Sequence, residues 1–230
     1  MCGRFVQYSD PEVYASRFDL DEVCKAEPRY NVAPTQSVLA IRPSKSGGRE
    51  LVPMRWGLIP SWSKGPDSRY SMINARAETA HTKPAYRSAF KNRRCLIPAE
   101  GFYEWQKTGK DKQPHLIRRR DRAPFAMAGL WETWRDGNGK TLESCTIIVT
   151  EANAVVRPIH DRMPALLATE DFTAWLNPRN GNNERLTGLL RPAPPDDLIL
   201  EPVSKLVNSP RNEGPQLLEP LSPETDRPPA

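Results

Sequence analysis

A succession of short apolar runs separated by turn residues is the feature that most limits how this 230-residue chain can fold. Two such runs are SVLAIRP and ELVPMRWGLI, and the turn-forming letters SKSGG between them predict a β-hairpin. Similar runs are RRCLIPA, GFYEWQ, PHLIRRR, FAMAGLWETW and ESCTIIVT, with further hairpin turns predicted at QKTGKDKQP and RDGNGK. Many short strands with few helices predict an α+β domain built on a curved, mostly antiparallel, barrel-like β-sheet.

Helix signals are fewer than strand signals. Ser9 followed by Glu12 is a capping-box pattern, and Val13, Tyr14 and Phe18 beyond it predict a short amphipathic helix. The other predicted helices are residues 84–90, residues 170–176 behind a Thr169 cap, and residues 183–190.

The length allows one large domain or two small ones, and we expect a single domain over residues 1–220. Six of the 24 prolines fall between Ser209 and Ala230, where the letters LSPETDRPPA contain too little apolar surface to pack. Residues 221–230 are therefore predicted to be a disordered tail.

The cysteines argue against a bound metal. All four lie far apart, without C-x-x-C spacing or a histidine nearby, so we expect no metal and no cofactor. Cys95 and Cys145 sit in apolar stretches and are predicted to be buried thiols in a reducing cytosol. With no membrane-length apolar run and no signal peptide, we expect a cytoplasmic protein.

The charge balance leaves two interpretations open. A formal charge of +5 and basic clusters at residues 91–94 and 118–122 are compatible with a polyanionic partner such as nucleic acid. A basic surface without such a partner fits the charge equally well.

The sequence contains none of the common catalytic motifs, so any catalytic residues must belong to a less common motif. No serine-hydrolase elbow, zinc-protease motif, phosphate-binding loop or dinucleotide fingerprint is present. Instead the sequence contains dense loops of small, polar and aromatic residues: RYNVAPTQ, RWGLIPSW, NARAET, EGFYEW and IHDRMP.

Each of these residues also has a purely structural interpretation. Cys2 suits a small hydrophobic position near the N-terminus, although removal of Met1 would leave it with a free α-amine beside its thiol. The other structural alternatives are packing for Trp56 and Trp62, a turn or cap for Asn74, a surface pair with Glu78 for Arg76, an exposed carboxylate for Glu104 and a structural hydrogen bond for His160.

Taken together and in order, the motifs MCGRF, YNVAPTQ, WGLIPSW, NARAET, GFYEW and HDRMP resemble the SOS response-associated peptidase (SRAP) family. The resemblance runs from Met1 to about Pro220. It implies covalent capture of abasic sites in single-stranded DNA, including junctions with duplex, by a monomer that is nucleoid-associated when bound. It also implies a β-rich fold with a positively charged groove leading to the N-terminus.

The resemblance also implies roles for individual residues. Cys2 would be the nucleophile after self-removal of Met1, surrounded by Asn74, Glu104 and His160. The implied DNA contacts are Arg4, Asn31, Pro34, Trp62, Arg76, Trp105, Thr150 and Arg162.

Two other functions stay open at this point. N-terminal nucleophile amidohydrolases such as glutamine amidotransferases also begin Met-Cys-Gly, and there the α-amine serves as base for the thiol. The second is a non-catalytic binder of single-stranded DNA, for which complexes would dissociate in salt and Cys2 would be dispensable.

Overall fold

Two β-sheets share one apolar core in this protein, whose computed structural model describes residues 2–66 and 72–221. Met1, whose removal is predicted, and residues 222–230 of the predicted tail lie outside these ranges, whereas Leu221, the first residue of that tail, is described. Leu221 itself donates its backbone N–H to the Pro202 carbonyl at 2.8 Å.

The first sheet closes into a five-stranded barrel. Its strands are β3 (Ser37–Pro43), β4 (Arg49–Trp56), β6 (Arg94–Ala99), β9 (Phe125–Arg135) and β10 (Thr141–Glu151). The circuit runs β10-β4-β3-β6-β9 and returns to β10, with one parallel pairing, between β4 and β10. Closure removes the free edges that a sheet would otherwise expose.

Three short strands extend the barrel where the long ones end. They are β5 (Asn74–Arg76), which lies parallel to β10, β11 (Arg162–Pro164), antiparallel to β10, and β12 (Leu166–Leu167), antiparallel to β9. The carboxyl end of β10 is thus flanked by β5 and β11, both of which carry predicted site residues.

The second sheet is antiparallel throughout and has the order β13-β8-β7-β1-β2. Its strands are β1 (Phe5–Gln7), β2 (Arg29–Val32), β7 (Gly101–Thr108), β8 (Asp111–Arg119) and β13 (Leu198–Pro202). A two-residue turn joins β7 to β8, since Thr108 pairs with Asp111, and Gly109 adopts φ +62° there. Glycine is favoured because tight hairpin turns require positive φ.

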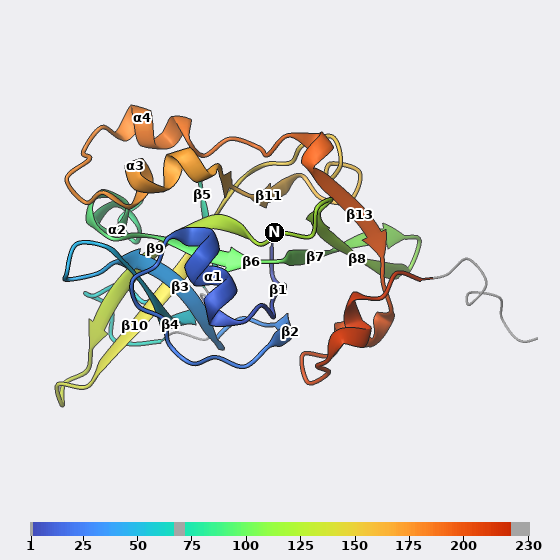
Figure 1. Cartoon of the computed structure of the whole chain (residues 1–230), viewed down its shortest axis with the longest axis horizontal. Coiled ribbons are helices and arrows are strands. Elements are labelled where there is room, and N and C mark those ends of the chain that lie inside the picture. Colours follow the sequence, from blue (N-terminus) through green and yellow to red (C-terminus); the bar gives the residue numbers. More distant parts are fainter. Residues whose placement is uncertain (1, 67–71, 222–230) are drawn as a thin grey trace, which may run out of the picture.

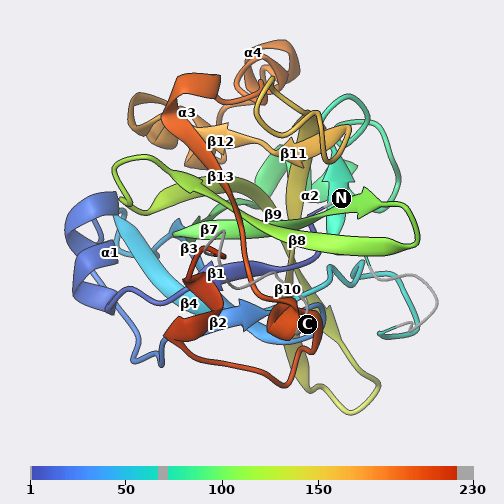
Figure 2. The same cartoon turned by 90° about the vertical axis from the view of Figure 1, so that its right-hand side faces the viewer.

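The helices cover the outside of the barrel. They are α1 (Pro11–Phe18), α2 (Arg87–Asn92), α3 (Phe172–Leu176) and α4 (Asn183–Gly188), with 3₁₀ turns η1 (Thr169–Asp171), η2 (Pro195–Asp197), η3 (Lys205–Asn208) and η4 (Pro215–Leu218). Figures 1 and 2 show α3 and α4 together at the opposite end of the molecule from η3 and η4.

Alternation along the strands divides the core into two faces. In β9, Ala126 and Ala128 face the helices, whereas Phe125 and Met127 pack with Phe5 and Phe102 of the second sheet. This is the period of two expected of strands buried on both sides. The predicted fold, a single α+β domain on a mostly antiparallel, barrel-like sheet, is confirmed.

Several predicted boundaries are wrong. The N-cap of α1 is Asp10 rather than Ser9, and Pro11 occupies the first turn, where its missing N–H costs nothing. Helix α2 begins at Arg87 with Tyr86 as its N-cap, and residues 84–86 form the turn that precedes it. The helix expected behind Thr169 is split into η1 and α3, and Ala168 is the N-cap of η1. The shortest strands, such as β1 and β5, were not predicted.

Arg94 joins the barrel to α2 and α3. Its side chain is 2% exposed, and its guanidinium donates to the carbonyls of Trp175 at 2.5 Å, Phe90 at 2.6 Å and Lys91 at 2.7 Å. It also donates to the Asn177 carbonyl. Burial lowers the pKa of Arg94 to about 10. One cation therefore satisfies carbonyls at the ends of two helices.

We expect Arg94→Ala to lower the free energy of unfolding by about 3 kcal/mol, because several buried carbonyls lose their donor. Equilibrium urea unfolding measures this. The matched control is Arg179→Ala, which removes an exposed arginine and should change stability by less than about 0.5 kcal/mol. Equal stability of the two variants would contradict the assigned role.

Candidate active site

Cys2 is completely buried just before strand β1. The Arg4 carbonyl accepts a hydrogen bond from the Tyr103 backbone N–H at 2.9 Å, which continues the β1–β7 pairing toward the N-terminus. The thiol donates weakly to the same Arg4 carbonyl, at 3.9 Å from Sγ. Burial raises the pKa of the Cys2 thiol far above its usual range, and the negative charge of Glu104 adds to the shift. The thiol is therefore neutral at rest.

Asn74 fixes the backbone of Cys2. Its Nδ2 donates to the Cys2 carbonyl at 2.8 Å, and its Oδ1 is buried without a hydrogen-bond partner in the described chain. Asn74 is the first residue of β5, where it pairs with Ile147 of β10, so the turn or cap considered for it is wrong. Tyr86 donates its hydroxyl to the Asn74 carbonyl at 3.2 Å. An amide held in this way leaves one oxygen available to a ligand.

Glu104 lies on β7, opposite His115 of β8. Only 4% of it is exposed, so the exposed carboxylate expected from its strand position is wrong. Residues two apart on a strand share a face, so Glu104 lies on the same side of β7 as the fully buried Phe102, and it lines one depression with His160. Burial raises the pKa of Glu104 above its usual range, and the charge of His160 works against this shift. A carboxyl group with a raised pKa is suited to proton transfer.

His160 lies in the loop between β10 and β11. Its Nδ1 accepts the backbone N–H of Arg162 at 2.9 Å, and an Asp161 carboxylate oxygen also lies 2.9 Å from Nδ1. A single nitrogen cannot accept from one and donate to the other. We assign the accepting role, because the backbone donor is fixed whereas the Asp161 side chain is 84% exposed. Neutral His160 then carries its proton on Nε2.

Two depressions are each lined by a residue that acts on the buried Cys2. One, of about 580 Å³, is lined by Glu104, Trp105, His160 and Asp161. The other, of about 650 Å³, is lined by Trp62, Asn74, Arg76 and Tyr86. Cys2 is bound by Asn74 from the second and acted on electrostatically by Glu104 from the first. The structure thus brings together Cys2, Asn74, Glu104 and His160 from four separate segments.

Arg4, Asn31 and Trp105 are held by the segment that contains η3. Arg4 donates to Asn31 Oδ1 at 2.7 Å and to the Val207 carbonyl at 2.9 Å, and Trp105 Nε1 donates to Asn208 Oδ1 at 2.7 Å. Asn31 is fully buried. DNA could contact the Asn31 side chain only if these hydrogen bonds broke. Asn31 is therefore placed to support Arg4.

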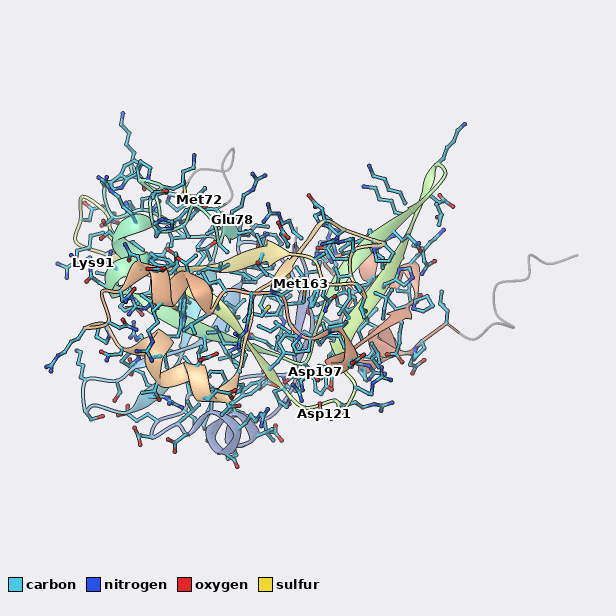
Figure 3. All side chains as sticks on the ribbon, turned by 90° about the horizontal axis from the view of Figure 1, so that it is seen from above. Met72, Glu78, Lys91, Asp121, Met163 and Asp197 are labelled. Carbon is cyan, nitrogen blue, oxygen red and sulfur yellow. The ribbon has the colours of Figure 1, made fainter. Side chains whose placement is uncertain are left out.

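The remaining predicted DNA contacts lie at different depths. Trp62 is 69% exposed, and Arg76 is exposed on the same depression. Pro34 is half-buried, and Thr150 is 6% exposed in the pairing of β10 with β11. Glu78 is paired with Arg162 rather than with Arg76, which corrects the surface pair considered above. Figure 3 labels Glu78 near Met72, on the segment around β5.

The basic clusters of the sequence are only partly available at the surface: four of their arginines are paired or buried, whereas Lys91, Arg120 and Arg122 are exposed without an ion pair among the described residues. Arg93 pairs with Glu132 at 2.7 Å and Arg94 is buried. Arg118 pairs with Glu201 and Arg119 with Asp121, both at 2.6 Å. Lys91 is the member of the first cluster that remains exposed without an ion pair in the described residues. Clustering along the sequence therefore does not locate a charged surface.

Within residues 2–66 and 72–221 the structure contains no group of three His, Cys, Asp or Glu side chains arranged to hold a metal. No helix in those ranges is long and apolar enough to cross a membrane. Cys95 and Cys145 are fully buried, as predicted.

A family model for the SOS response associated peptidase (SRAP) matches residues 1–210. The chain belongs to the SRAP family. It is 46% identical over 223 residues to the abasic site processing protein YoaM of Bacillus subtilis, covering 95% of this chain and 98% of YoaM. It is 32% identical to the abasic site processing protein YedK of Escherichia coli, with 96% and 100% covered.

The solved structures of other proteins show the same fold. A crystal structure of a protein from Bacteroides thetaiotaomicron matches this SRAP chain with a TM-score of 0.86 at 26% identity, covering 96% of this chain and all of the other.

Sequence reasoning missed two supporting residues of this SRAP protein. Tyr86 bonds the Asn74 carbonyl and Asn208 bonds Trp105. No local signal marks either, because Tyr86 belongs to the turn before α2 and Asn208 ends a 3₁₀ turn far along the chain. Only the tertiary fold brings them to the site.

We expect Glu104→Gln to stabilise the folded protein at pH 7. The folded-state pKa of Glu104 lies above the unfolded value, so its contribution to stability is full below the unfolded pKa and is lost as pH rises through the folded pKa. Urea unfolding at pH 7 and pH 4 should show a gain at pH 7 that shrinks at pH 4.

Glu151→Gln is the matched control, since Glu151 is exposed at the end of β10 and should change stability by less than about 0.5 kcal/mol. A Glu104→Gln protein less stable than the parent at pH 7 would contradict the assigned burial cost.

Proposed function

We propose that this SRAP protein captures abasic sites in single-stranded DNA covalently, through the α-amine and thiol of Cys2 after Met1 has been removed. The observation that carries the proposal is the placement of Cys2: its carbonyl is held by Asn74, and Glu104 and His160 line the adjoining depression. Membership of a family whose relatives are named abasic site processing proteins supports it.

The chemistry favours an N-terminal amine. An abasic deoxyribose opens to an aldehyde, which a neutral amine attacks to form an imine and release water. An α-amine has a pKa of about 7.7 to 8.0 against about 10.4 for lysine, so on the order of 300-fold more of it is neutral at pH 7. The amine of Cys2 is therefore the better nucleophile.

The thiol then makes the adduct stable. The sulfur adds to the imine carbon and its proton passes to the nitrogen, which closes a five-membered thiazolidine ring. Since both groups belong to one residue, this step is effectively unimolecular. A thiol that is neutral at rest suits the reaction, because the proton it carries is the one the nitrogen receives.

The neighbouring residues would supply the proton transfers. His160, with its proton on Nε2, is assigned to opening of the sugar ring by transfer to the ring oxygen. Glu104 is assigned to accepting a proton from the α-amine, which its raised pKa favours. Asn74 would hold the Cys2 backbone with Nδ2 and orient the sugar by accepting a hydrogen bond from its hydroxyl at Oδ1.

The surface around the site supports sequence-tolerant binding. Arg76 and Arg162 would bind phosphates, and Trp62, exposed at the rim, would stack on a flanking base or at a junction with duplex. Arg4 and Trp105, which the η3 segment holds in place by hydrogen bonds, would also contact the DNA. The protein would act as a monomer and bind the nucleoid through damaged DNA, and its peptidase activity would be the self-removal of Met1.

We expect Cys2→Ala to abolish, and Cys2→Ser to weaken strongly, an adduct that survives denaturation, because serine closes a much less stable ring. The measurement is a denaturing gel of protein mixed with an abasic single-stranded oligonucleotide, with a mass spectrum to show loss of Met1. Cys24→Ala is the control thiol and should crosslink like the parent. A resistant adduct with Cys2→Ala, or glutaminase activity without any adduct, would overturn the proposal.

We expect His160→Ala to slow adduct formation by about 10²-fold or more, which is the usual contribution of a general acid. His81→Ala, which removes a histidine beside α2, should react at the parental rate. Time courses of crosslinking under single-turnover conditions measure both rates. Parental rates in both variants would contradict the role given to His160 while leaving that of Cys2 intact.

A further inference from the structure

Three cationic side chains follow one another along the segment that ends in α2. Lys83, Arg87 and Lys91 are all exposed, and the Arg87 N–H donates to the Lys83 carbonyl at 2.9 Å, so a helical turn joins them. Steps of four residues place them on one face, about 6 Å apart along the axis. The opposite face, with Ala89 and Phe90, is buried in the core.

These three cations, which we call the basic ridge, have no ion-pair partner in the described chain. The next arginines behave differently, since Arg93 pairs with Glu132 and Arg94 donates to carbonyls. Like charges four residues apart on a helix repel one another. A bound polyanion would neutralise these charges and remove the repulsion between them. The three cations are therefore suited to binding a polyanion.

The basic ridge begins at the candidate site. Lys83 lines the depression that also holds Asn74 and Arg76, and Arg87 and Lys91 line the next one, of about 420 Å³. Neither lining contains an acidic side chain among the described residues, whereas the depression lined by Glu104 and Asp161 sets these two acids beside Lys107 and Lys112. The cations that run from Asn74 along α2 therefore line depressions without acidic neighbours. Figure 3 shows Lys91 at the outer edge of the molecule beside α2.

We propose that the basic ridge binds the phosphates of one of the two DNA arms that flank the abasic site. The proposal rests on the proposed function and adds a direction to it: the arm that leaves the site past Asn74 follows Lys83, Arg87 and Lys91. Contacts of this kind fix the path of a strand without reading its bases.

The test compares Lys83→Gln/Arg87→Gln/Lys91→Gln with a control of equal charge, Lys45→Gln/Arg135→Gln/Lys140→Gln. The control residues are exposed and lie in or beside the turns that join β3 to β4 and β9 to β10. Each protein is titrated, over a range of salt concentrations, with two oligonucleotides of equal length. Both carry an unreactive abasic analogue, near the 5′ end in one and near the 3′ end in the other, so that each offers one long arm.

We expect the ridge variant to lower the slope of log K against log salt by about 2 for only one of the two oligonucleotides, because about 0.7 is lost for each of three phosphate contacts to a single strand. The control should keep the parental slope for both. Parental slopes for the ridge variant on both oligonucleotides, equal losses on both, or the same loss in the control would each overturn the proposal.

A crosslinking assay distinguishes failure of the basic-ridge proposal from failure of the proposed function. With reactive abasic sites, the ridge variant should lose more crosslinking rate on the oligonucleotide that carries the ridge-side arm than on the one that lacks it. If the parental protein formed no adduct at all, the proposed function would fail, but the salt slopes would still decide whether the basic ridge binds a strand.

Discussion

The hydrogen bond from Asn74 to the Cys2 carbonyl joins the two sheets at the point where chemistry is proposed. Asn74 belongs to β5 and is fixed by its pairing with β10 of the barrel, while Cys2 lies three residues before the start of β1 in the second sheet. Because Phe5, the first residue of β1, packs its ring on Trp56 with the ring centroids 4.9 Å apart, the shared core fixes both sheets relative to each other. The position of the thiol therefore follows from the packing of the whole domain rather than from a flexible terminus.

Burial gives the site its electrostatic character. Both Cys2 and Glu104 have raised pKa values, with loss of water as the largest cause. A carboxylate whose pKa is raised is a stronger base, which suits the proton transfer proposed for Glu104. The fold accepts the cost of burying a carboxylate here, as functional sites commonly do, and compensates with well-packed apolar strands around it.

The cations show why charge along a sequence is a poor guide to a binding surface. Arg94 stands in one of the two basic runs of the chain, residues 91–94, yet it is buried against helix carbonyls, and Arg4 is held by Asn31 and the Val207 carbonyl. Arg87, which lies outside that run, is exposed without an ion pair among the described residues. Helical spacing and the distribution of acidic partners decide which cations remain available, and both depend on contacts between distant segments.

The sequence by itself determined the strand-rich α+β class, the three hairpins and the family, because alternation, turn residues and ordered motifs are local properties. It also indicated Cys2, Asn74, Glu104 and His160 as a set. Only the tertiary structure decided that Glu104 is buried, that Asn31 supports Arg4 and that Tyr86 and Asn208 complete the surroundings. The physical reason is that burial and hydrogen-bond partners are set by segments far apart in the chain, which meet only when the barrel closes.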